Sequence, residues 1–199
     1  TAAHGRVDVL VNNAGLGWMG LVADMPAAQV RRLFEVNVLG LIDLTQRVRP
    51  GMIERGQGHI VNVSSIAGWV SVPPLSVYSS TKFAVVGFTD GLRRELVGKG
   101  VTVALVNPGP LNPGFSERAV KEDVGEIRDK SMGGFPSSVV AHAIARSIRL
   151  AHVPGYATMA SPRIMGLARL GAVPGVALLL DLASIGARQL APRRDRHTP

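Results

Sequence analysis

The residues with the clearest chemical potential are a tyrosine and a lysine four positions apart, Tyr78 and Lys82. Residues with this spacing share one face of a helix. A free tyrosine, with a pKa of about 10, is a poor base at neutral pH, but a lysine ammonium within a few ångströms favours the phenolate and lowers that pKa. Such a tyrosine can give or take a proton at a carbonyl or alcohol oxygen. The alternative is an exposed helical pair that contributes only roughly a few tenths of a kcal/mol.

Two further polar side chains could act on the same group. Ser65 precedes Tyr78 by 13 residues and could hydrogen-bond the same substrate oxygen, although it could equally cap a turn or helix. Asn37 lies on the apolar stripe of an expected helix, where an unpaired amide costs about 1–3 kcal/mol. A backbone carbonyl, an ordered water or both must satisfy it. A buried water there could relay protons to Lys82, and the alternative is a purely structural amide.

The elements that must position these side chains alternate between strands and helices. Apolar runs predict buried strands at residues 7–12, 59–63 and 101–106, with helices from about residue 26 and over about residues 77–97. The apolar stripe of the first helix is Leu33, Asn37, Leu41, Leu44 and Val48, and that of the second is Val85, Phe88, Leu92 and Leu96. This order predicts an α/β fold in which helices cover the faces of a parallel sheet.

Polar and glycine-rich runs follow each of these strands. They are Asn12-Asn13-Ala14-Gly15, Ser64-Ser65 and Asn107-Pro108-Gly109. In open α/β sheets, ligands bind at the carboxyl ends of the strands. The three runs are therefore predicted to converge on one crevice.

The rest of the chain is less regular, and we expect one domain over residues 1–199. Its predicted parts are a catalytic core at 5–115, a flap with C-terminal helices at 110–190 and a basic tail at 191–199. Within them we expect a flap with a short helix at 110–135, a helix at 137–150 and a short strand at 155–159. Loops such as the flap and residues 66–76 are expected to shape a substrate pocket.

Composition excludes several classes of function. The chain has no cysteine, and its five histidines show no zinc-ligand spacing, so no metal site is expected. The net charge of +8 comes with only 5% aromatic residues, so we expect no nucleic-acid partner. The apolar segment 162–190 is interrupted by Pro174, and we expect no transmembrane helix. Peripheral contact of this segment with a membrane, or with a partner subunit, stays open.

Taken together, the motifs resemble the short-chain dehydrogenase/reductase family. The motifs that carry the resemblance are Asn12-Asn13-Ala14-Gly15, Asn37, the run from Ile60 to Ser65, Tyr78-Ser79-Ser80-Thr81-Lys82 and Asn107-Pro108-Gly109. Their spacing agrees as well, with 24 residues from Asn13 to Asn37, 28 to Ser65, 13 to Tyr78 and 4 to Lys82. The resemblance is strong over about residues 5–115 and implies a Rossmann-like, doubly wound parallel sheet.

The resemblance implies an oxidoreductase that transfers a hydride between NAD or NADP and a secondary alcohol or ketone. Tyr78 would be the general acid/base, Lys82 would hold the nicotinamide ribose, Ser65 would position the substrate oxygen and Asn37 would hold a relay water. The implied cofactor contacts are Asn13, Ala14, Gly15, Tyr78, Lys82, Pro108, Gly109 and Leu111. A cytoplasmic homo-oligomer is also implied, because relatives pair their two long helices across subunits.

The sequence departs from the family's pattern in two places. Pro113 stands where the family usually has a threonine that bonds the cofactor carboxamide. The first strand–helix units, roughly 75 residues with the glycine-rich pyrophosphate turn, are expected before Thr1. The run Gly15-Leu16-Gly17-Trp18-Met19-Gly20 imitates that turn, but a helix opening there would meet Pro26, so we expect a flexible loop. A non-catalytic dinucleotide-binding or scaffolding protein, or an inactive fragment, remains the alternative function.

Overall fold

The computed structural model describes residues 5–112, 120–121 and 135–151, and a three-stranded parallel sheet is at its centre. The strands are β1 (Val9–Asn12), β3 (Gly58–Val63) and β4 (Val101–Val106), in the order β1-β3-β4. Asn12 pairs with Asn62, and Val63 pairs with Val106, so the three carboxyl ends are aligned. The predicted parallel sheet is confirmed, although β1 begins two residues later than the apolar run suggests.

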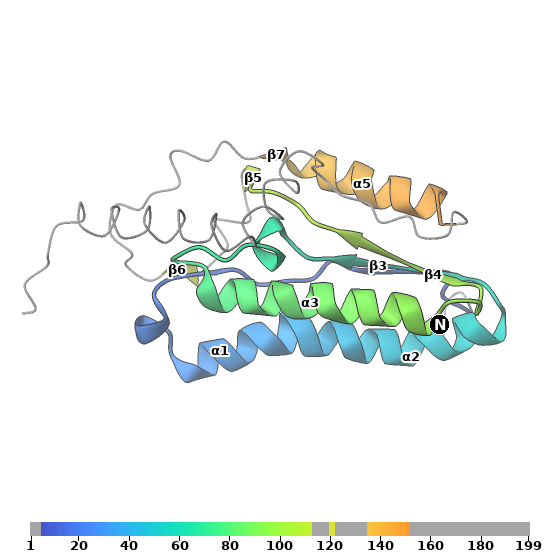
Figure 1. Ribbon diagram of the computed structural model, residues 1–199, viewed down its shortest axis with the longest axis horizontal. Coiled ribbons are helices and arrows are strands. Elements are labelled where there is room, and N and C mark those ends of the chain that lie inside the picture. The colour runs from blue at the N-terminus through green and yellow to red at the C-terminus, as the bar shows by residue number, and fades with distance from the viewer. Residues whose placement is uncertain (1–4, 113–119, 122–134, 152–199) are drawn as a thin grey trace, which may run out of the picture.

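Helices cover both faces of this sheet (Figure 1). One face carries α1 (Ala27–Phe34), the π-helix η2 (Glu35–Leu39), α2 (Gly40–Glu54) and α3 (Ser76–Glu95). The other face carries α5 (Ser137–Arg149), close to the predicted bounds of 137–150. This arrangement is the predicted doubly wound α/β architecture.

Side chains that alternate along the strands build a separate core on each face. Ile60 packs with residues of α2 and α3, whereas its neighbour Val61 packs with Val140 and Ala143 of α5. The alternation follows from the two-residue period of a strand. Because both faces are covered, the strand sequences are almost continuously apolar.

One residue of the predicted stripe on the first long helix faces solvent instead. Leu44 is 49% exposed, and the buried position is taken by Thr45. The cause is η2, which interrupts the α-helix between α1 and α2. A π-turn holds an extra residue and rotates the following helix, so the inward face moves on by one position.

Short elements connect these layers. They are β2 (Trp18–Met19), η1 (Val22–Asp24), η3 (Ile66–Gly68), β5 (Leu111–Asn112), β6 (Val120–Lys121) and β7 (Phe135–Pro136). β2 pairs with β6, and β5 pairs with β7. The glycine-rich run 15–20 opens no helix, as predicted, but it contains the strand β2 and is therefore more ordered than the expected loop.

Several sequence-based expectations concern residues outside the described ranges. They are most of the flap at 110–135, Pro113, the strand at 155–159, the apolar segment 162–190 and the basic tail 191–199. Within the described ranges, no helix combines the length and apolar character that crossing a bilayer requires.

Candidate active site

Tyr78 and Lys82 lie in the first two turns of α3, where both side chains are buried. Tyr78 is 7% exposed and Lys82 is 5% exposed, and Lys82 Nζ lies 5.7 Å from the centroid of the Tyr78 ring. The ammonium also donates a hydrogen bond to the Val63 carbonyl, at the end of β3, over 3.3 Å. These contacts exclude the alternative of an exposed helical pair.

Ser65 reaches the same place from the end of β3. Its hydroxyl caps η3 by accepting a hydrogen bond from the Ala67 amide over 3.2 Å, and its side chain also hydrogen-bonds Tyr78. Gly68 lets η3 pack closely against α3, because a Cβ there would lie 2.7 Å from Ser64 Oγ and 2.8 Å from the carbonyl oxygen of Lys82. The cap that the sequence offered as the alternative is confirmed, and the hydrogen bond with Tyr78 brings Ser65 beside the proposed acid; its contact with a substrate oxygen stays a prediction.

Asn37 lies within the π-helix η2, and its amide is fully buried. The Leu16 amide donates to Asn37 Oδ1 over 2.7 Å, while Asn37 Nδ2 donates to the Leu16 carbonyl over 2.9 Å and to Thr81 Oγ1 over 3.1 Å. The predicted backbone-carbonyl partner is confirmed. Since both Nδ2 hydrogens are engaged, a relay water would have to use another atom of this residue. π-Turns within helices are frequent at functional sites.

Gly15 is the point at which Asn37 and Lys82 meet. A Cβ on this glycine would lie 3.3 Å from Asn37 Oδ1 and 3.5 Å from Lys82 Nζ. The loop after β1 is exposed at Asn13, Ala14 and Gly15, so it is accessible directly beside a buried cation. Such a surface is suited to a polar ligand that approaches the backbone closely.

The end of β4 completes this edge of the sheet. The Pro108 carbonyl accepts a hydrogen bond from the Ile66 amide over 2.9 Å, and the Val106 carbonyl accepts one from the Ser64 amide over 2.8 Å. Pro108 is buried and Gly109 is half-buried, and Leu111 begins β5. The predicted convergence of the three strand ends is thus confirmed.

Burial dominates the electrostatics of the Tyr78–Lys82 pair. It raises the pKa of Tyr78 to about 12, although the hydrogen bond with Ser65 acts in the opposite direction, and it lowers the pKa of Lys82 from 10.5 to about 8. The pKa of Tyr78 is therefore raised, not lowered as the sequence predicted, because the loss of water around a phenolate outweighs the hydrogen bond with Ser65. Tyr78 is a protonated phenol at neutral pH.

Sequence reasoning missed the polar residues that support the site. Thr81 accepts from Asn37 and donates to the Tyr78 carbonyl over 2.7 Å. Farther along the strands, Asn12 Nδ2 donates to Asn62 Oδ1 over 2.8 Å, and Asn62 Nδ2 donates to Thr89 Oγ1 over 2.9 Å. The available signal was an asparagine in the middle of an apolar strand, since a buried amide requires partners.

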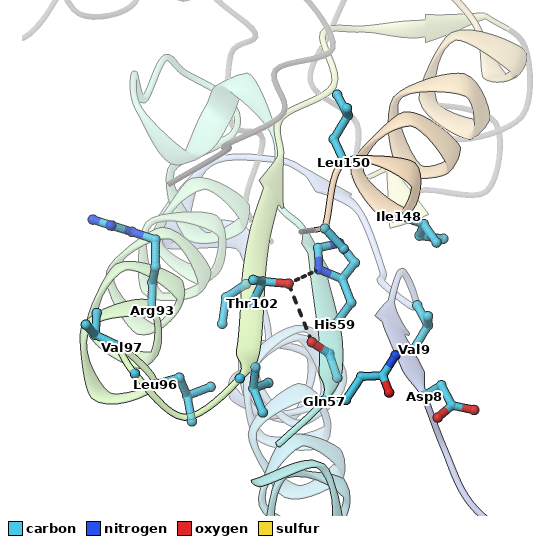
Figure 2. Close-up of a pocket in the computed structure, with 16 residues that line it drawn as sticks. Asp8, Val9, Gln57, His59, Arg93, Leu96, Val97, Thr102, Ile148 and Leu150 are labelled. Carbon is cyan, nitrogen blue, oxygen red and sulfur yellow. Dashed lines mark hydrogen bonds between the residues drawn. The ribbon is translucent and has the colours of Figure 1, made fainter. Parts of the chain in front are cut away.

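A cavity of about 640 Å³ lies at the opposite edge of the sheet, where the strands begin. Figure 2 shows His59 of β3 facing Thr102 of β4, with 2.7 Å between His59 Nδ1 and Thr102 Oγ1. Burial lowers the pKa of His59, although its contact with Thr102 acts in the opposite direction. None of the four residues predicted to be catalytic lines this cavity. Among the described residues, no group of histidine and acidic side chains could hold a metal ion.

The fold and the site define a class of protein: a doubly wound α/β domain whose carboxyl sheet edge brings together Tyr78, Lys82 and Asn37, all buried, and the half-buried Ser65. Residues 1–123 match the sequence profile of the short chain dehydrogenase family. The chain belongs to this family.

Known proteins similar to this chain include both sequences and solved structures. Ketoacyl reductase HetN of Nostoc sp. is 37% identical over 145 residues, which are 73% of this chain and 49% of HetN. A short-chain dehydrogenase of Streptomyces avermitilis is 30% identical, with a TM-score of 0.72, over 96% of this chain and 73% of that one. ElxO with NADP bound is 27% identical, with a TM-score of 0.71, over 83% of this chain and 70% of that one. The chain spans about half or less of the length of the curated relatives it matches.

Proposed function

We propose that the whole protein is an NAD(P)-dependent oxidoreductase that transfers a hydride between a nicotinamide cofactor and a secondary alcohol or ketone. The observation that carries this proposal is the burial of Tyr78 and Lys82 together at the carboxyl edge of the sheet, with Ser65 bonded to the tyrosine. The name of HetN, a ketoacyl reductase, supports a ketone as substrate. The NADP bound to ElxO supports the cofactor.

The residues at the strand ends fit such a cofactor. The space beside Gly15 would be occupied by any side chain there, and it opens next to the Lys82 ammonium. In this proposal Asn13, Ala14 and Gly15 line the adenosine side. Lys82 and Tyr78 hold the ribose, and the nicotinamide lies against Pro108, Gly109 and Leu111. When bound, the nicotinamide supplies or accepts the hydride.

The protein's own residues would handle the proton. In the direction of ketone reduction, the protonated Tyr78 phenol donates to the oxygen on which negative charge develops. Ser65 positions that oxygen and donates to it, and the Lys82 ammonium stabilises the phenolate that Tyr78 becomes. With a pKa of about 8, Lys82 is largely charged at neutral pH and can return a proton to Tyr78. A water held at Asn37 would then reprotonate the lysine.

The test is a Tyr78→Phe variant of the whole protein, assayed for ketone-dependent oxidation of NADPH and for NADPH binding by fluorescence titration. We expect turnover to fall by at least about 100-fold, because the variant has no transferable proton, while NADPH binding, to which Lys82 also contributes, weakens far less. Ser65→Ala should also reduce turnover, whereas the matched Ser80→Ala change removes an exposed hydroxyl and should not. Unchanged turnover in Tyr78→Phe would instead support a non-catalytic scaffold.

A second copy of the chain is the proposed partner. The outer face of α3 carries Phe83, 45% exposed, and two glycines, Gly87 and Gly91, beside which the structure is open. Leu39 and Leu44 are also exposed on the adjoining helical segments η2 and α2. An apolar face of this kind can be buried in a helix-to-helix interface. In this proposal the protein acts as a homo-oligomer in the cytoplasm, which cell fractionation would test.

A further inference from the structure

Trp18 is a buried side chain whose polar group has no role in the proposed reaction. It is 3% exposed, and its indole Nε1 has no hydrogen-bond partner among the described residues. An indole N–H is a donor only, so rotation cannot turn it into an acceptor. A buried donor without a partner costs about 1–3 kcal/mol, and a phenylalanine or leucine would pack there without that cost.

The position of Trp18 relates this N–H to the candidate active site. Its side chain belongs to the buried cluster that also contains Tyr78 and Ala67, the second residue of η3. Trp18 lies two residues after Leu16, and the backbone of Leu16 forms two hydrogen bonds with the Asn37 amide. Trp18 therefore packs in the same buried cluster as Tyr78, the proposed acid.

Two segments that the sequence predicts to shape a substrate pocket meet at the strand of Trp18. Gly20, just after β2, donates a backbone hydrogen bond to the Pro74 carbonyl over 3.0 Å, which ties β2 to the loop at 66–76. Trp18 itself pairs through its backbone with Val120 of β6, which lies within the segment 110–135. The strand that carries the indole is thus tied to the loop at 66–76 and to β6.

We propose that the Trp18 indole N–H donates a hydrogen bond to a second oxygen of the substrate, beside the oxygen that Tyr78 protonates. This inference rests on the proposed function and refines it. The preferred substrates are then ketones or alcohols that carry a further acceptor oxygen, such as the ester or thioester carbonyl of a β-keto compound. A site built to hydrogen-bond an oxygen discriminates strongly against an analogue that lacks it, because its donor is then left unpaired.

A matched pair of ketones tests this selectivity in the whole protein. Ethyl acetoacetate and 2-heptanone have the same main-chain length, but only the first carries a second acceptor. We expect wild type to prefer ethyl acetoacetate in kcat/KM. Trp18→Phe, which keeps an apolar ring and removes the N–H, should lower kcat/KM about tenfold for the ester and less than twofold for 2-heptanone. An equal loss on both ketones, or no loss on either, would overturn the inference.

A spectroscopic test avoids activity and any folding defect of the variant. The 199 residues contain two tryptophans, Trp18 and Trp69. In the ¹⁵N-labelled whole protein, the indole N–H cross-peak of Trp18 is the one that is missing from Trp18→Phe. Adding ethyl acetoacetate to the wild-type protein with NADP should move the Trp18 proton downfield, and 2-heptanone should not. If both ketones bind and are reduced while the Trp18 peak stays still, the inference fails and the proposed function stands. If neither ketone is bound or reduced, both fail.

Discussion

The Asn37 amide donates to the Thr81 hydroxyl over 3.1 Å, which joins the π-helix η2 to the residue immediately before Lys82. Thr81 in turn donates to the carbonyl of Tyr78. One buried hydroxyl thus connects three of the four residues proposed to be catalytic. It is a positioning residue, because it touches their side chains or backbone and not the reacting atoms.

Replacing Thr81 by valine should separate this role from that of an ordinary helix hydroxyl. The change leaves an Asn37 N–H unpaired in a buried place, so we expect the free energy of unfolding to fall by about 1–3 kcal/mol. Urea unfolding measures it. Ser80→Ala is the matched control, since Ser80 makes the same kind of bond, to the Val77 carbonyl, on the exposed side of the helix. Equal losses in the two variants would contradict a positioning role. We also expect kcat of Thr81→Val to fall more than its affinity for NADPH.

The pKa of Lys82 predicts a rise in stability at alkaline pH. Burial lowers this pKa from 10.5 to about 8, so between these values the unfolded chain holds a proton that the folded chain has lost. The free energy of unfolding therefore increases with pH in that window, by on the order of 2 kcal/mol. Above about pH 10 the raised pKa of Tyr78 acts in the opposite direction, because the unfolded chain then loses its phenol proton first. Stability should peak near pH 10.

Lys82→Met checks the origin of that slope. Methionine keeps the apolar stem but does not titrate, so the variant should lose most of the rise in stability between pH 8 and pH 10. Urea midpoints at half-unit pH intervals would compare it with wild type. If the variant kept the full wild-type slope, another group would have to be responsible.

The elements were predictable because their signals are local. Val101–Val106 is apolar except at Thr102, and the strand has the predicted bounds. The four-residue spacing of Tyr78 and Lys82 also needs only the helical period. Which residues of the first long helix face the sheet was not predictable in this way. A π-turn leaves no periodic signature, so Leu44 was expected inside where Thr45 is buried.

The electrostatics of the site could not be predicted because they depend on how much water the fold removes. Spacing brings Lys82 near Tyr78, but the packing of η3 and β2 over α3 buries the phenol and raises its pKa. The same packing leaves the indole N–H of Trp18 without a hydrogen-bond partner in the described part of the chain, which no sequence pattern reveals. Motifs therefore predicted which side chains come together but not the pKa values that burial gives them.

Gly15→Ala should weaken cofactor binding with little loss of stability. The added methyl would lie 3.3 Å from Asn37 Oδ1 and 3.5 Å from Lys82 Nζ, where it crowds the exposed backbone proposed to face the cofactor. We expect the Kd for NADPH to rise about tenfold in a fluorescence titration of the whole protein, since a fixed methyl bars close approach of the ligand. Gly91→Ala, whose Cβ would meet nothing within 4 Å, is the control and should bind NADPH as wild type does. Unchanged NADPH binding by Gly15→Ala would argue against contact between this loop and the cofactor.

The exposed ring of Phe83 predicts the surface through which two copies associate. Because Phe83 projects from α3 beside open space at Gly87, an aspartate at position 83 would place a charge in any interface formed there. Phe83→Asp should reduce the mass measured by light scattering to that of one chain, since an unpaired charge at an apolar interface is strongly unfavourable. Val97→Asp is the control, because Val97 is exposed beyond the end of α3 and should leave the mass unchanged. If Phe83→Asp kept the wild-type mass, or wild type itself had the mass of one chain, this face of α3 would not be an interface between copies.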